Sequence, residues 1–77
     1  MRNERIAVQS SNIAAVAYDL HRQVLEVEFI GRKGAANSVY QYIAVPPAVY
    51  ERFMQSPSKG SFFAAEIRGK FSSQKIQ

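Results

Sequence analysis

The stretch Tyr40-Gln41-Tyr42-Ile43-Ala44-Val45-Pro46-Pro47 divides the chain into a half patterned as sheet and a half patterned as helix. It begins with alternating aromatic and polar residues, as a strand does. It ends with two prolines, which cannot continue a strand ladder but suit the first turn of a helix. Because Gln41 prefers water, its parity predicts that Tyr40 and Tyr42 face the core with their hydroxyls at the rim.

The half before this stretch is predicted to be a meander of three antiparallel strands over residues 13–20, 24–29 and 39–45. The middle strand is the clearest, since Leu25, Val27 and Phe29 alternate with Glu26 and Glu28, which are expected to face solvent. In the first strand, the same alternation places Val16 and Tyr18 on one face and Ala15 and Ala17 on the other. Residues 1–9 are interpreted as a short arm or edge strand.

The half after it predicts two helices. Residues 48–55 place Val49, Tyr50, Phe53 and Met54 along one stripe at helical spacing. Pro57 ends this helix because the residue before a proline avoids the α region. Ser58 is the expected N-cap of a second helix that runs to about residue 68.

These elements together predict one α+β domain of the order β-β-β-α-α, with both helices packed on one face of the sheet. The domain spans residues 1–77, with a core at about 10–71, an N-terminal arm at 1–9 and a fraying polar tail at 72–77.

Composition narrows the classes of function. The 77 residues contain no cysteine and a single histidine, so we expect no disulfide, no metal site and no cofactor. No apolar run approaches the roughly 20 residues that cross a bilayer, and no secretory leader is recognisable, which makes the cytoplasm the expected compartment. The net charge of +4 favours a polyanionic partner only slightly.

The first candidate site is the corner Ser58-Lys59-Gly60. A helix start offers unpaired N–H groups and partial positive charge, Lys59 adds a full charge, and Gly60 permits close approach of a phosphate. The simpler interpretation is an ordinary capped helix, and it is the commoner one.

A second candidate is a basic patch made by Arg32 and Lys33, in a glycine-flanked loop, with Arg68, Lys70 and Lys75 near the C-terminus. Surface charges of this kind are usually only solubilising. Tyr40 and Tyr42 also resemble a platform on which nucleobases stack, although core filling is the commoner role for such a pair.

Catalysis is not expected. His21 lies in a predicted turn without a nucleophile or carboxylate to pair with it, and Glu26 and Glu28 have no partner acid for general acid–base chemistry. No phosphate-binding loop, zinc-protease or nucleophile-elbow motif occurs.

Several segments, in their order and spacing, resemble the KTSC domain family. They are Ser10-Ser11-Asn12, Leu25-Glu26-Val27-Glu28-Phe29, Tyr40-Gln41-Tyr42, Ser58-Lys59-Gly60 and Ile67-Arg68. The family occurs at the C-terminus of some lysyl-tRNA synthetases and as stand-alone bacterial proteins, and its hallmark is the central Y-x-Y. Its function is unassigned, with RNA binding proposed, and it offers no catalytic residues to carry over. This chain departs from the pattern at Ala17, at Ala64 and in a longer basic loop before Tyr40.

The sequence therefore leaves two hypotheses. In the first, the domain binds RNA (tRNA or single-stranded) without catalysis, using Lys59, Arg68 and Lys70, with Arg32 and Lys33, against phosphates. In the second, it is a protein-interaction or homo-oligomerisation module that binds no nucleic acid, and an open strand edge pairs with a second copy.

Overall fold

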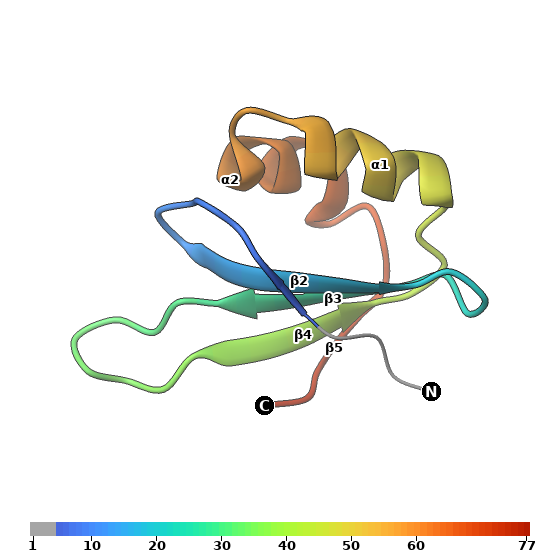
Figure 1. The fold of residues 1–77 in the computed structure, drawn as a ribbon. Helices are drawn as coiled ribbons and strands as arrows, with labels where there is room; N and C mark the ends of the chain where they lie inside the picture. The colour runs from blue at the N-terminus through green and yellow to red at the C-terminus, as the bar shows by residue number, and fades with distance from the viewer. Residues whose placement is uncertain (1–4) are drawn as a thin grey trace.

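The computed structural model describes residues 5–77, which form a five-stranded antiparallel sheet with the strands in sequence order. The helices lie together on one face of this sheet (Figure 1). The elements are β1 (Ile6–Ala7), β2 (Ile13–Asp19), β3 (Val24–Phe29), β4 (Ser38–Tyr42), α1 (Pro47–Gln55), α2 (Lys59–Phe62), the π-helical segment η1 (Phe63–Ile67) and β5 (Ser73–Lys75).

The predicted α+β class is confirmed, but the prediction of three strands is wrong. β1 lies within the segment interpreted as an arm or edge strand and pairs with β2. β5 lies within the segment predicted to be a fraying tail and pairs with β4. All three residues of β5 are exposed, so its place in the sheet comes from backbone hydrogen bonds and not from a buried face.

The predicted alternation sets the two faces of the sheet. Val16, Leu25 and Val27 are fully buried beneath the helices. Tyr40 and Tyr42 share that face, as predicted, and Tyr42 belongs to the buried core while Tyr40 is half-buried against it.

The opposite face carries a buried carboxylate that the sequence places in solvent. Glu26 is only 5% exposed because Arg5 covers it, with Arg5 Nη1 2.6 Å from Glu26 Oε2. Gln41 donates a second hydrogen bond to the same carboxylate, and Arg5 also lies 3.5 Å from Glu28. The expectation of a solvated Glu26 is wrong because a residue outside the alternating strand supplies its partner.

The hinge between sheet and helices is built by residues 43–46. Ala44 adopts a left-handed conformation, with φ of 60°, which cannot continue a strand. β4 therefore ends at Tyr42, whereas the predicted strand ends at Val45. Val45 is fully buried, and its N–H donates to Gln23 while its carbonyl accepts from the Tyr18 hydroxyl. These two hydrogen bonds attach the segment 43–46 to the end of the β2–β3 hairpin where β2 turns into β3.

The first helix packs along its predicted stripe, and the second helix packs beside it. Phe53 of α1 and Ile67 of η1 are fully buried. The ring centroids of Phe53 and Phe62 lie 5.7 Å apart where the two helices meet. Ser58 is the N-cap, as predicted, because its hydroxyl accepts a hydrogen bond from the Ser61 N–H. The second helix is not uniformly α-helical, since it widens into the π-helical turn of η1. None of the helices in residues 5–77 combines the length and the apolar character that a membrane-spanning helix requires.

Candidate functional site

One groove runs between the second helix, the start of β2 and the β3–β4 loop. Its first part, the polar chamber, has a volume of about 600 Å³. The polar chamber is lined by Gln9, Ser10, Ser11, Asn12, Arg32, Pro57, Ser58, Lys59, Gly60, Ser61, Ala64 and Arg68.

The second part, the aromatic chamber, has a volume of about 410 Å³. It is lined by Asn12, Phe29, Ile30, Arg32, Tyr40, Tyr42, Phe63 and Arg68. Asn12, Arg32 and Arg68 line both chambers and therefore stand where the two meet.

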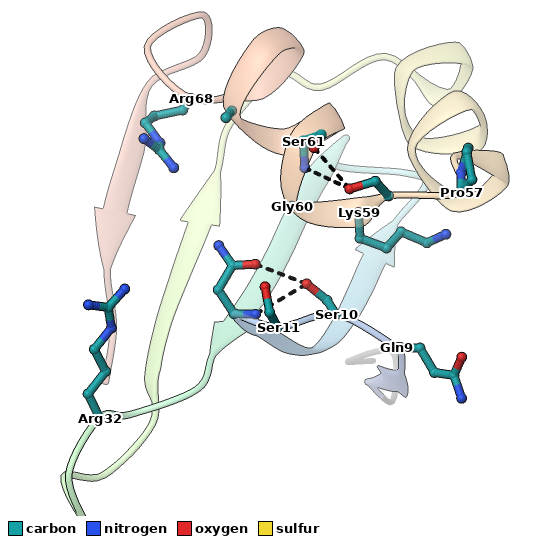
Figure 2. A pocket seen from close by; sticks show the side chains of 12 residues that line it. Gln9, Ser10, Ser11, Arg32, Pro57, Lys59, Gly60, Ser61 and Arg68 are labelled. Carbon is teal, nitrogen blue, oxygen red and sulfur yellow. Dashed lines mark hydrogen bonds between the residues drawn. The ribbon is translucent and has the colours of Figure 1, made fainter.

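The polar wall begins at the turn before β2, which the sequence predicts as a turn but not as part of a site. The Ser10 hydroxyl accepts from the backbone N–H groups of Asn12 and Ile13 and donates to Asn12 Oδ1 at 2.9 Å. Figure 2 shows Ser10 and Ser11 of this turn close to Gly60 of the second helix. The resemblance described above runs through this turn, and that is the signal in the sequence that points to it.

Gly60 lets the second helix approach this turn. A Cβ atom at position 60 would lie 2.7 Å from Asn12 Oδ1, closer than an ordinary contact. Glycine at position 60 therefore allows the second helix to pack closely against Asn12. Its backbone is not in the left-handed conformation for which glycine is often required.

The predicted corner is present, but two of its groups are already engaged. Ser58 uses its hydroxyl to cap the Ser61 N–H. The Lys59 ammonium donates to the Ser56 carbonyl at 2.6 Å, and in Figure 2 its side chain extends away from both arginines. This corner supplies one wall of the groove, while its lysine is directed elsewhere.

Of the seven predicted anion-binding residues, the groove brings together Ser58, Lys59, Gly60, Arg32 and Arg68. The other two, Lys33 and Lys70, are exposed and line neither chamber. Lys75 lies opposite Tyr40 in the β4–β5 register, and so on the sheet face that carries the groove.

The charged side chains that line the groove are all positive. Arg32 and Arg68 form no salt bridge with any described residue, whereas Arg5 and Arg52 each do. No aspartate or glutamate among residues 5–77 lines either chamber. The groove thus presents two uncompensated guanidinium groups to whatever enters it.

The tyrosine pair predicted as a family motif forms the floor of the aromatic chamber. Burial raises the pKa of the Tyr42 hydroxyl, the neighbouring Tyr40 raises it further, and the charge of Arg68 opposes the rise. Tyr42 is therefore a neutral phenol near pH 7 and can donate a hydrogen bond.

No group of three histidine, cysteine, aspartate or glutamate side chains in the described part of the chain could hold a metal ion.

Comparison with known proteins assigns the domain to a family. The KTSC domain model matches residues 9–71, and the chain belongs to the KTSC domain family. A crystal structure of a KTSC domain protein from Yersinia pestis superimposes with a TM-score of 0.84 at 39% identity, covering 96% of this chain and 97% of that one.

Two kinds of bacterial relative share the domain. An uncharacterised protein of Stutzerimonas stutzeri is 38% identical over 60 residues, 78% of each chain. A lysine–tRNA ligase of Nostoc punctiforme is 37% identical over 68 residues, which are 88% of this chain but only 11% of the ligase.

Proposed function

We propose that this domain is a non-catalytic module that binds single-stranded RNA through the groove. The observation that carries the proposal is the pair Arg32 and Arg68, two guanidinium groups without a salt-bridge partner in residues 5–77, beside a groove that no described carboxylate lines. Guanidinium groups bind phosphate oxygens with paired, charge-assisted hydrogen bonds.

Two further observations support RNA in particular. Aromatic rings form the floor beside the arginines, and unpaired bases stack on such rings. A lysine–tRNA ligase, an enzyme that acts on tRNA by its name, contains a segment similar to this chain. The absence of any catalytic arrangement in the sequence supports a binding role.

The test is a fluorescence titration of the domain with a single-stranded RNA and with tRNA at several salt concentrations. We expect binding to weaken with salt. Each of Arg32→Ala and Arg68→Ala should weaken it about tenfold, which is the lower end of the roughly 1.5–3 kcal/mol that a hydrogen bond to a charged group contributes, because both arginines are exposed. Arg22→Ala is the matched control, since Arg22 lies in the turn at the other end of the β2–β3 hairpin.

Two results would count against the proposal. One is affinity weaker than about 1 mM at low salt, or affinity that salt does not change. The other is an equal loss from Arg22→Ala, which would mean that net charge alone drives binding.

Self-association is a second candidate. β1 and β5 are the edge strands of the described sheet, and Ile6 on β1 and Ile76 just after β5 are 53% and 41% exposed. Such edges can pair with a second copy. Light scattering that shows a monomer at every concentration would exclude this candidate.

A further inference from the structure

The floor of the aromatic chamber is a closed circuit of four rings. The successive ring centroids of Phe29, Tyr40, Tyr42 and Phe63 lie 5.8, 6.5 and 5.3 Å apart, and Phe63 returns to Phe29 at 5.2 Å. Tyr42 and Phe63 are buried, while Phe29 and Tyr40 are half-buried. Each of the four rings contacts two of the others. The part of this aromatic surface that solvent can reach belongs mainly to Tyr40 and Phe29.

The arginines stand at one side of this floor. The Arg68 guanidinium lies 5.6 Å from the centroid of Phe63, which is the distance of a cation–π contact. Arg32 lines the same chamber from the β3–β4 loop. A phosphate held by the two arginines therefore has an aromatic surface next to it, at the place where the base of the same nucleotide would lie.

Asn12 adds a donor whose orientation the hydrogen-bond pattern fixes. Both lone pairs of the Ser10 hydroxyl accept backbone N–H groups, so its hydrogen must be donated, and it is donated to Asn12 Oδ1. The amide oxygen is therefore turned toward Ser10. The Nδ2 group donates to no described residue, and Asn12 lines both chambers, so this donor is available to a ligand at their junction.

We propose that the groove holds one unpaired nucleotide of an RNA strand, with its base against Tyr40 in the aromatic chamber and its phosphate between Arg32 and Arg68. Asn12 Nδ2 donates to an oxygen of the same nucleotide, and the neighbouring backbone continues into the polar chamber. A base inside a duplex is stacked and paired, and it cannot reach this floor.

This inference rests on the proposed function but makes a separate claim, namely that one base contributes to affinity. The experiment compares three ribose-phosphate backbones of six units by fluorescence anisotropy. One carries no base, one carries a single adenine and one carries two. We expect the single adenine to raise affinity about tenfold over the baseless backbone, as base–aromatic stacking does elsewhere. A second adenine should raise the affinity by no more than about twofold, because either adenine can occupy the single base site but both cannot occupy it at once.

Variants assign the gain to the predicted ring. Tyr40→Leu should remove the gain from the adenine while the salt dependence stays, and Tyr40→Phe should keep most of the gain. The comparison of the three backbones needs only the unmodified chain, so it decides the question even if Tyr40→Leu fails to fold.

The outcomes separate the two claims. If all three backbones bind equally with the same salt dependence, the nucleotide site is wrong and the phosphate-binding function stands. If none binds, both are wrong. Two further probes are a matched RNA duplex and a DNA single strand of the same sequence. Binding of the duplex as tightly as of the single strand would also overturn the nucleotide site, and equal binding of the DNA strand would overturn its preference for RNA.

Discussion

Replacing Gly60 with alanine should change the groove more than it changes the stability of the fold. The new methyl group would meet Asn12 Oδ1 at 2.7 Å, whereas ordinary contacts begin at 3.4 Å. The amide must therefore retreat by about 0.7 Å or rotate, and the hydrogen bond from Ser10 at 2.9 Å lengthens or breaks.

The energetic terms nearly cancel. Losing the Ser10–Asn12 hydrogen bond costs about 0.5–1.5 kcal/mol. Alanine is favoured over glycine inside a helix by up to about 1 kcal/mol, and less in the first turn, where position 60 lies. We therefore expect the free energy of unfolding to change by less than about 1 kcal/mol, which for a domain of this size is a shift in Tm of no more than about 4–8 °C.

Circular dichroism with urea gives the stability, and the side-chain amide resonance of Asn12 reports the local change. Ala48→Gly is the matched control, because Ala48 is exposed and is the second residue of α1, as Gly60 is the second residue of α2. An Asn12 resonance that does not move in Gly60→Ala, or a loss of stability as large as that of a core deletion, would contradict the close approach of Gly60 to Asn12.

The remaining predictions concern the core, the hinge and the tyrosines. Phe53→Ala should cost about 3–5 kcal/mol in urea unfolding, because Phe53 is fully buried, and a cost below about 1 kcal/mol would contradict that packing. Ala44→Gly should raise the unfolding free energy by about 0.5–1 kcal/mol, since glycine relieves the left-handed backbone at φ of 60°, and a loss of stability would contradict the geometry of the hinge. Burial raises the pKa of the Tyr18 and Tyr42 hydroxyls, so their contribution to the free energy of unfolding should be fully present below the ordinary value of about 10 and be lost as the pH rises through the raised values; urea midpoints measured above about pH 9 check this, and Tyr42→Phe should make the fall smaller.

The strands and helices with an apolar pattern could be predicted from the sequence, and those without one could not. β3 was predictable to the residue, because Leu25 and Val27 alternate with glutamates. β5 carries no such pattern, since Ser73, Gln74 and Lys75 are polar and exposed and pair only through their backbone. Its place in the sheet depends on where the chain returns after η1, which local sequence does not encode.

The candidate site could be predicted only in part, for a related reason. Charge and spacing single out Arg32 and Arg68 but give no sign that a loop and a helix end meet at one groove. The same reasoning overrates Lys59, whose ammonium binds the Ser56 carbonyl. Asn12 was missed because a serine- and asparagine-rich turn has the same composition whether or not it lines a site.

An NMR titration of the domain with a short single-stranded RNA would locate the binding surface residue by residue. The account predicts that the amide resonances that shift most belong to the turn of Ser10 to Asn12, to Arg32, Tyr40 and Arg68, with little change at Glu26 and Gln41 on the opposite face of the sheet. Shifts centred on that opposite face, or no shifts at RNA concentrations of about 1 mM and low salt, would contradict it.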